Sequence, residues 1–366
     1  MRIQSLRAGV AAMILAAMLC GCGGGDAGSA VAAGTAEASH VWVVNAGSST
    51  VQAFAADAVT GALTARDAPV PTGGVPVSIA VAPSGRFAYV ASLSTGEVFA
   101  YSIADSDGAL TGVGPPLPTG SGAVAIAIDP SGRFAYVVSA SASEIRTLAI
   151  DPLTGRLERV VAVHALPGVV PLSIAIAPSG RTAYVVDFSG DRVLSFGIDP
   201  ATGELDEIAA PVATGAAPIA VAVHASGAFA YVVNNALRSI SILAIDPDTG
   251  ALRPTGRSVA TGEGPVAFAM DRAGRFAYVV NLGSGDVSAY VVDSATASLV
   301  PVGAPVAAGT APRAIAVDRS ARVAYVANEG SDDISVYAVS GNSGELTPIG
   351  PRVPSGTTPV AIAVGP

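Results

Sequence analysis

The chain has 366 residues, of which 51% are apolar, 13% are charged and 5% are aromatic. This composition excludes an intrinsically disordered chain, which is poor in apolar residues and rich in charge. All 19 basic residues are arginines, which excludes lysine-based Schiff-base chemistry, and a net charge of −9 with no run of basic residues argues against nucleic-acid binding.

The first 22 residues have the pattern of an export signal. Arg2 and Arg7 precede an apolar run over 8–19, which is shorter than the roughly 20 residues that span a bilayer. The run leads into Leu-Cys-Gly-Cys at 19–22, which resembles the cleavage box of bacterial lipoproteins. That resemblance implies lipid attachment at Cys22, and an ordinary secretory signal cut nearby is the alternative.

Residues 23–39 are rich in Gly, Ala and Ser without any periodic pattern, which predicts a flexible tether. The only two cysteines, Cys20 and Cys22, lie in the predicted signal. A chain cleaved there would contain neither a thiol nucleophile nor a disulfide. We expect a protein of the bacterial cell envelope, anchored by lipid in the outer membrane and periplasm or at the cell surface.

From residue 40 onward the chain repeats seven times, with a period of 47 or 48 residues. Each copy has one aromatic residue in an apolar run such as Phe-Ala-Tyr-Val-Val-Asn, and a leucine and a β-branched residue keep the same spacing. The aromatic positions are Trp42, Tyr89, Tyr136, Tyr184, Tyr231, Tyr278 and Tyr325. A period in the high forties with four short strands per copy is typical of β-propeller blades.

A complete copy contains four predicted strands and two predicted turns. Pro-Ser-Gly-Arg, as at 130–133, separates the first two strands, and Asp-Pro-x-Thr-Gly, as at 246–250, separates the last two. In such turns Pro fixes φ, Asp accepts bonds from the backbone and Gly supplies a positive φ. The fold class is therefore all-β, with seven four-stranded antiparallel blades over 40–366.

The two ends of the repeat region predict how the ring closes. The first copy lacks its innermost strand, because the matching position falls in the predicted tether. The missing strand stands at the other end, where 359–364 read Pro-Val-Ala-Ile-Ala-Val with no second strand after them. Pairing this segment beside 41–45 gives seven complete blades and leaves no open end. An open solenoid, uncapped at both ends, is the alternative.

The strings Tyr-Val-Val-Asn and Asp-Pro-x-Thr-Gly-x-Leu at this period resemble the YVTN-repeat and lactonase-like β-propeller families, over about residues 40–366. The resemblance implies the seven-bladed fold. The lactonase-like family includes 6-phosphogluconolactonases and many exported proteins of unknown chemistry, so the resemblance implies no single activity. A phosphorylated intermediate of cytosolic metabolism is not the expected substrate of an exported protein.

The loops after the second and fourth strands vary between copies and share one face, where we expect a ligand near the channel mouth. A ring of polar residues begins the loops that follow the second strands. The ring comprises Asn45, Ser92, Ser139, Asp187, Asn234, Asn281 and Asn328. These side chains bind a ligand in one interpretation. In the other, they end their strands and hold the loops through bonds to the backbone.

Charged residues on the same face supply weak catalytic candidates. Acidic residues such as Glu144 predominate there, with Glu329 and Asp332 nearby, and the cations are Arg192, Arg238 and Arg313. Arg313 replaces an apolar residue at the start of an inner strand, so it should lie near the channel mouth. It binds a carboxylate or phosphate there in one interpretation, and forms a salt bridge to a neighbouring acid in the other.

Catalytic motifs are absent from the sequence. His40, His164 and His224 all fall outside the candidate face, and there is no Gly-x-Ser-x-Gly elbow, no metal-ligand spacing and no phosphate loop. We expect no cofactor, although an acid-rich rim could hold Ca²⁺ or Mg²⁺. A carboxylate base such as Asp187 or Glu144, aided by Arg192 or Arg313, is the remaining catalytic arrangement.

Two functions stay open at this point. The first is a membrane-tethered, non-catalytic binding or scaffold propeller, whose variable face meets an envelope protein, a glycan or a small molecule. The alternative is a lactonase-like carboxylic-ester hydrolase that opens a small carboxylated lactone at the channel mouth. In both cases the chain contacts the membrane only through its lipid, does not bind nucleic acid and is expected to be a monomer.

Overall fold

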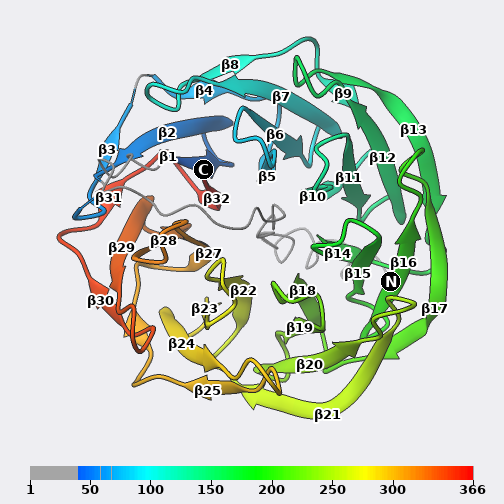
Figure 1. Ribbon diagram of the computed structural model, residues 1–366. Coiled ribbons are helices and arrows are strands. Elements are labelled where there is room, and N and C mark those ends of the chain that lie inside the picture. Colours follow the sequence, from blue (N-terminus) through cyan, green and yellow to red (C-terminus); the bar gives the residue numbers. More distant parts are fainter. Residues whose placement is uncertain (1–39, 58, 67, 366) are drawn as a thin grey trace, which may run out of the picture.

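The computed structural model describes residues 40–57, 59–66 and 68–365, so the predicted signal and tether lie outside the described residues. All regular structure in these ranges is β-strand, arranged as seven sheets around a central channel (Figure 1). No helix that is long and apolar enough to cross a bilayer occurs in the described part of the chain. The predicted all-β, seven-bladed architecture is confirmed.

Each blade has an apolar inner strand next to the channel, followed by a second and a third strand. The inner strands are β5 (Pro76–Val81), β10 (Ala123–Ile128), β14 (Pro171–Ile176), β18 (Pro218–Val223), β22 (Pro265–Met270), β27 (Pro312–Val317) and β32 (Pro359–Val364). The second strands are β1 (His40–Asn45), β6 (Phe87–Ser92), β11 (Phe134–Ser139), β15 (Thr182–Asp187), β19 (Phe229–Asn234), β23 (Phe276–Asn281) and β28 (Val323–Asn328). The third strands are β2 (Thr50–Ala56), β7 (Glu97–Ile103), β12 (Glu144–Ile150), β16 (Arg192–Ile198), β20 (Ser239–Ile245), β24 (Asp286–Val292) and β29 (Asp333–Val339).

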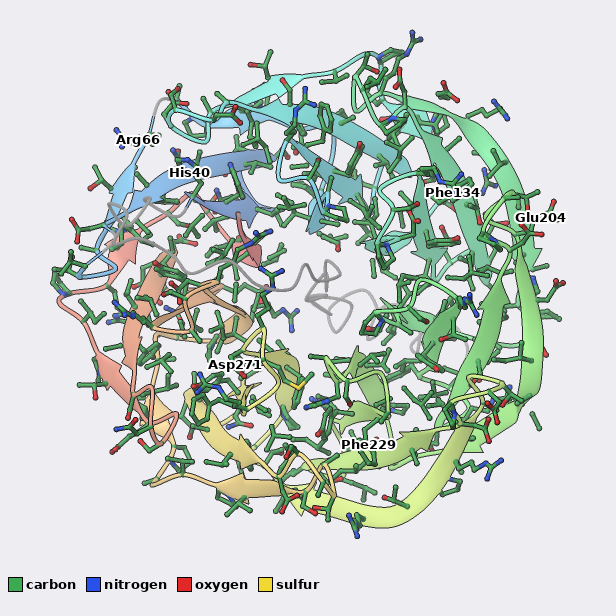
Figure 2. The ribbon with its side chains drawn as sticks, in the orientation of Figure 1. His40, Arg66, Phe134, Glu204, Phe229 and Asp271 are labelled. Carbon is green, nitrogen blue, oxygen red and sulfur yellow. The ribbon has the colours of Figure 1, made fainter. Side chains whose placement is uncertain are left out.

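The outer strands fall into two groups. Three blades have a continuous outer strand: β13 (Leu157–Ala165), β17 (Leu205–Ala213) and β21 (Leu252–Ala260). In the other four blades the outer strand is split in two: β3 (Leu63–Ala65) and β4 (Val70–Pro71), β8 (Leu110–Gly112) and β9 (Leu117–Pro118), β25 (Leu299–Pro301) and β26 (Val306–Ala307), β30 (Leu346–Pro348) and β31 (Val353–Pro354). Figure 2 places Arg66 and Glu204 at this outer rim and Asp271 nearer the channel.

The ring closes through the last strand of the chain. β32 pairs antiparallel with β1, with Trp42 opposite Ala363 and Val44 opposite Ala361. Blade 1 is therefore assembled in the order β32, β1, β2, β3, from both ends of the described chain. This confirms the predicted closure, and the open solenoid is wrong.

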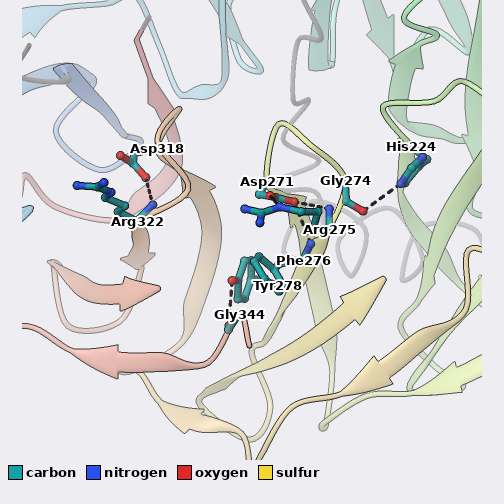
Figure 3. Close-up of polar contacts among 9 residues, drawn as sticks. All are labelled: His224, Asp271, Gly274, Arg275, Phe276, Tyr278, Asp318, Arg322 and Gly344. Atoms are coloured by element: carbon teal, nitrogen blue, oxygen red, sulfur yellow. Dashed lines mark hydrogen bonds and ion pairs between the residues drawn. The ribbon is translucent and has the colours of Figure 1, made fainter. Parts of the chain in front are cut away.

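In six of the seven blades the repeated aromatic residue forms a hydrogen bond to the next blade. The Tyr278 hydroxyl donates to the Gly344 carbonyl at 2.9 Å, in the strand-three-to-four turn of the following blade (Figure 3). Trp42 does the same through Nε1 to the Gly108 carbonyl at 2.8 Å. A glycine is needed at 344 because its φ is +73° and a Cβ there would collide with the Phe276 ring. Burial of the hydroxyl raises the pKa of Tyr278.

In four blades a side chain that follows the inner strand holds the hairpin turn to the second strand: Asp129, His224, Asp271 or Asp318. In blade 6 the Asp271 carboxylate accepts the backbone N–H groups of Arg275 at 2.6 Å and Phe276 at 2.9 Å (Figure 3). In blade 5 the same position is occupied by His224, whose Nε2 lies 3.0 Å from the Gly274 carbonyl of the next blade. These contacts are local or join neighbouring blades, so the turn face is built mainly for rigidity.

Candidate functional site

A pocket of about 460 Å³ opens on the face that carries the loops after the second strands. Its walls come from inner strands and from those loops, so it lies at the channel mouth. Three blades and the segment that leads into β32 contribute to it. The lining residues are Ile219, Asn235, Val266, Leu282, Ala311, Arg313, Glu329, Gly330 and Thr358.

The charged centre of the pocket is an ion pair within blade 7. Arg313 lies on β27, and its Nε is 2.9 Å from an Oε of Glu329, which begins the loop after β28. The Arg313 side chain is only 7% exposed, whereas that of Glu329 is 30% exposed. Burial lowers the pKa of Arg313 and the nearby Glu329 carboxylate raises it; a guanidinium so paired stays charged.

The position of Arg313 follows from the repeat. The second residue of the inner strand is apolar in the neighbouring blades, as in Ile219 and Val266, and these side chains line the same pocket. An arginine in this register therefore enters the channel mouth, where burial of an unpaired charge would be costly. Glu329 supplies the compensating charge. The sequence-based salt-bridge interpretation of Arg313 thus describes its contact in this structure.

The rest of the lining is mostly apolar. Ile219, Val266 and Leu282 present side chains from blades 5 and 6. Asn235 adds an amide, whose Nδ2 donates to the Pro265 carbonyl at 2.9 Å and so ties blade 5 to blade 6. One ion pair and one amide therefore interrupt an apolar wall, which is the usual composition of a small-molecule site.

The predicted polar ring lies inside the blades. All seven of its members, from Asn45 to Asn328, are fully buried. Asn328 is representative: it accepts the Gly309 N–H at 3.0 Å and donates to Asp333 at 2.7 Å and to Ser335 at 2.9 Å. Asn234 accepts the Gly215 N–H and donates to Ser241, and Asn281 donates to Asp286 and Ser288.

The remaining ring members also bond within the protein. The Ser92 hydroxyl donates to the Gly73 carbonyl at 2.7 Å and that of Ser139 to the Thr119 carbonyl at 3.4 Å. Asn45 accepts the hydroxyl of Ser355 at 2.8 Å, which helps to join β1 to the end of blade 7. None of the ring residues is among those that line the channel-mouth pocket. Their positions agree with the loop-holding interpretation rather than with ligand contact.

Asp187 is the ring member that carries a charge. Its carboxylate accepts the Val170 N–H at 3.1 Å, the Ser189 hydroxyl at 2.8 Å and the Arg192 Nε at 2.9 Å. The side chain is fully buried, and Arg192 is 39% exposed. Asp187 and Arg192 therefore form a satisfied ion pair that orders one loop of blade 4.

The other predicted charges pair locally as well. Glu144 binds Arg146 at 2.6 Å in blade 3, and Arg238 binds Glu263 at 2.6 Å on the exposed rim. The pocket that contains Arg313 is not lined by the other three catalytic candidates, Asp187, Glu144 and Arg192. The structure therefore does not bring the four catalytic candidates together.

The histidines keep the separation expected from the sequence. His224 is on the turn face, and His164 lies on the outer strand β13, 4.0 Å from Glu207. His40 begins β1 and contacts the Trp42 ring. Within the described ranges no group of three or more His, Cys, Asp or Glu side chains is placed to hold a metal ion.

Asn235 is the polar lining residue that the sequence did not single out, and Glu329 was expected only as a neighbour of the candidate charges. Both directly follow the polar ring residue at the end of a second strand. The equivalent residues in the other blades are Ala46, Leu93, Ala140, Phe188 and Leu282. A polar residue at a position that is apolar in the other blades could therefore have identified Asn235 and Glu329 as site residues. The same signal identified Arg313.

Comparison with known proteins agrees with the seven-bladed fold. The family model described as "Lactonase, 7-bladed beta-propeller" matches residues 76–269 and 263–364. A search of curated proteins gives no match.

Solved structures with the same fold include a periplasmic gluconolactonase of Pseudomonas aeruginosa, 22% identical, with a TM-score of 0.77 over 90% of this chain and 99% of that one. A 6-phosphogluconolactonase candidate from Bacteroides fragilis is 19% identical, with a TM-score of 0.79 over 90% and 98% of the two chains. A similar candidate from Bacteroides uniformis is 18% identical, with a TM-score of 0.80 over 89% and 99%. At these identities the likeness concerns the fold alone, whereas the family match covers most of the chain. The chain belongs to the lactonase family of seven-bladed β-propellers.

Proposed function

We propose that this protein binds a small lactone with one carboxylate and an apolar body in the channel-mouth pocket, and opens the ring by hydrolysis. The observation that carries the proposal is the Arg313–Glu329 ion pair, set in an otherwise apolar wall. Family membership supports the reaction class. The gluconolactonase named for P. aeruginosa supports it only by analogy.

Arg313 would recognise the negative charge of the ligand. It is the only cation that lines the pocket in the described part of the chain. A buried guanidinium binds a carboxylate through charge-assisted hydrogen bonds that are worth about 1.5–3 kcal/mol. A phosphate ester carries nearly two charges, which one arginine already paired with Glu329 would balance poorly. The pocket therefore favours a monoanion.

The apolar wall argues against a polyhydroxylated ligand. Ile219, Val266 and Leu282 offer no hydrogen bonds, and Asn235 already donates to a backbone carbonyl. A hydroxyl group buried without a partner costs about 1–3 kcal/mol. Two or three such hydroxyls would cancel the gain from the carboxylate, so an alkyl or aryl body fits better than a sugar.

Hydrolysis would use both members of the ion pair. Glu329 is the more exposed member, so water can reach its carboxylate. As general base it would take one proton from a water whose oxygen bonds to the lactone carbonyl carbon. Arg313 would stabilise the oxyanion. Collapse of this intermediate breaks the ring C–O bond, and Glu329 returns the proton to the leaving oxygen, which yields a hydroxy acid.

A panel of lactones, with and without a carboxylate, tests this proposal on the full chain. Ring opening is followed by acid release, with and without Ca²⁺ and Mg²⁺. We expect turnover of carboxylated, apolar lactones that falls at least 100-fold in Glu329→Gln, while ligand binding persists. Binding without turnover contradicts the proposed hydrolysis, and absence of both contradicts the proposed site as well.

A binding role without catalysis is the second candidate. One observation favours it: a carboxylate oxygen of Glu329 is held by the Arg313 guanidinium at 2.9 Å, so that oxygen is already occupied and is not free to bind a water. In this case the parent protein binds the carboxylated lactone without opening it. The Glu329→Gln variant likewise binds the lactone without opening it. A scaffold role for an envelope protein or glycan would instead show as co-purification that survives Arg313→Gln.

We also propose that the chain is exported and anchored through lipid on Cys22. The support is the segment Leu19–Cys22 after a short apolar run. Mass spectrometry of the N-terminal peptide from cell membranes tests it. A diacylglyceryl group on Cys22, lost with membrane association in Cys22→Ser, is the expected result, and an unmodified N-terminus cut elsewhere contradicts it.

A further inference from the structure

A second cavity lies between blades 4 and 5, in the outer part of the ring. It has a volume of about 260 Å³ and is lined by residues from the end of β17, from β20 and from β21. These strands lie next to one another at the rim (Figure 1). The cavity shares no lining residue with the channel-mouth pocket, so it is a separate candidate site.

The cavity exists because the third strand of blade 5 has small side chains on the side that faces blade 4. The first, third and fifth residues of a third strand share this side, since side chains alternate along a strand. In blade 5 they are Ser239, Ser241 and Leu243, and Leu243 belongs to an apolar cluster with Val193 of blade 4. Each of the other six blades has at least one charged or aromatic residue at these three positions.

The fifth position shows which group is missing. In blades 2, 6 and 7 this residue is a tyrosine, whose hydroxyl donates to the last carbonyl of the outer strand of the preceding blade. The bonds run from Tyr101 to Pro71 at 3.2 Å, from Tyr290 to Ala260 at 2.8 Å and from Tyr337 to Ala307 at 2.8 Å. The equivalent carbonyl beside blade 5 belongs to Ala213, which ends β17 and lines the cavity. Leu243 has no hydroxyl to donate to it.

The polar groups that surround such a tyrosine are present in blade 5. In blade 6 the Tyr290 hydroxyl is also hydrogen-bonded to Ser288, to which Asn281 donates at 2.9 Å. In blade 5 Asn234 donates to Ser241 at the same distance of 2.9 Å. Ser288 is only 7% exposed, whereas Ser241 is partly exposed and lines the cavity. Blade 5 therefore keeps the partners of a phenol and lacks the phenol.

Blade 3 also has a leucine at the fifth position, but longer side chains lie beside it. Glu144 and Arg146 occupy the first and third positions and bind each other at 2.6 Å. Both side chains lie close to Gly120, at the end of blade 2. Blade 5 has serine at both positions, so only there does the loss of the aromatic ring leave small hydroxyl groups alone on this side.

A second residue of the cavity also breaks the repeat. Leu237 lines it from the loop after β19 and is 59% exposed. The equivalent loop residues in the other blades are small or polar: Ser48, Thr95, Ala142, Gly190, Ser284 and Ser331. An exposed leucine at this place gains free energy when it packs against an apolar ring. Among the described residues that line the cavity none is acidic, and the guanidinium of Arg257 donates to the Thr296 carbonyl at 2.8 Å. A neutral ligand is therefore favoured.

We propose that the cavity between blades 4 and 5 binds a small, neutral phenol. Its ring would lie between Leu243 and Leu237, in the space that tyrosine rings occupy in blades 2, 6 and 7. Its hydroxyl would donate to the Ala213 carbonyl and accept a bond from the hydroxyl of Ser241, whose oxygen already accepts from Asn234. A space left by a missing side chain can bind a free aromatic molecule of matching size. The proposal is independent of the hydrolysis proposed at the channel mouth.

Methyl NMR of the leucine-labelled full chain in detergent, titrated with p-cresol, tests the proposal. We expect the methyl signals of Leu237 and Leu243 to shift and to saturate, because the bound ring lies against both. The dissociation constant should be on the order of 1 mM, as expected for so small a ligand. Leu153 is the internal control, since it is 78% exposed on a turn of blade 3 and should not respond.

Leu243→Tyr is the most direct variant, because it places in blade 5 the residue that blades 2, 6 and 7 carry. Its own ring would occupy the site, so p-cresol should no longer shift the Leu237 signals. Ser241→Ala provides a second route if Leu243→Tyr fails to fold. It removes one hydroxyl partner and should weaken p-cresol binding at least threefold. The proposal is overturned if the parent shows no saturable shift up to about 20 mM p-cresol, or if the shifts persist unchanged in either folded variant.

Discussion

On the turn face of the propeller, most blades repeat the same contacts: in four blades an aspartate or histidine holds the turn after the inner strand, and in six blades an aromatic residue bonds to the next blade. On the loop face, equivalent positions carry different residues, and three of them, Asn235, Arg313 and Glu329, converge on one pocket. The two faces therefore show that positions of the same repeat have two different roles. Residues that recur in every blade stabilise the ring, and residues that break the pattern give a single sector of the channel mouth its chemistry.

The largest expected effect comes from opening the ring. Deletion of residues 359–366 removes β32, exposes the inner edge of β1 and leaves blade 1 incomplete. The loss should exceed the 5–15 kcal/mol that stabilises a typical domain, so we expect no cooperative thermal transition by circular dichroism. Deletion of 365–366 alone spares β32 and is the control. A truncated chain as soluble and heat-resistant as the parent would contradict the closure.

The next effect concerns the pattern-breaking residues. Arg313→Gln removes the buried cation, and we expect affinity for a carboxylated ligand to fall by about 10- to 150-fold, in line with 1.5–3 kcal/mol for charge-assisted bonds. Isothermal titration measures it. Arg238→Gln is the control, since Arg238 makes an exposed pair with Glu263 and should leave affinity unchanged.

Asp187 tests whether a residue of the buried ring has any part in function. Asp187→Asn removes one charge of the pair with Arg192 and places an amide among groups that donate to it. We expect a loss of about 1–3 kcal/mol in the free energy of unfolding and unchanged ligand affinity. Chemical denaturation and titration on the same variant measure both. If Asp187→Asn abolished turnover but left the free energy of unfolding unchanged, the catalytic site would lie in blade 4 and not at Arg313.

The smallest effect compares two members of the aromatic series. Tyr278→Phe removes the bond to the Gly344 carbonyl and should cost about 1 kcal/mol. Tyr136→Phe should be nearly neutral, because the Tyr136 hydroxyl has no hydrogen-bond partner in this structure; Thr147 instead donates to the Gly203 carbonyl. Equal losses in the two variants would show that the inter-blade bond is not the source of the stability.

Much of the fold could be predicted from the sequence because the signal is repeated. Seven aromatic residues in one register indicated the number of blades. The inner strand at 359–364, which has no second strand after it, indicated that the C-terminus closes the ring. The splitting of four outer strands was not predicted, although the Gly and Pro residues near 114 and 303 mark it. Such local breaks depend on which N–H groups face outward, which requires the register of the sheet.

The site was only partly predictable. Arg313 could be identified because it interrupts an apolar strand. The pairing of Arg313 with Glu329, and the approach of Asn235 from blade 5, depend on how far neighbouring loops reach across the channel mouth. The polar ring was correctly placed at the strand ends, but burial depends on loop conformation. Asn328, for example, points into its blade because the Gly309 N–H and Ser335 need partners there.

The central claim is that Arg313 gives the channel mouth its affinity for a carboxylate. The most direct measurement is calorimetric titration of the parent and Arg313→Gln with an apolar carboxylated lactone and with its uncharged methyl ester. We expect the parent to prefer the carboxylate by at least tenfold and the variant to bind both alike. Equal binding of acid and ester by the parent, or a preference that persists in Arg313→Gln, would contradict the account.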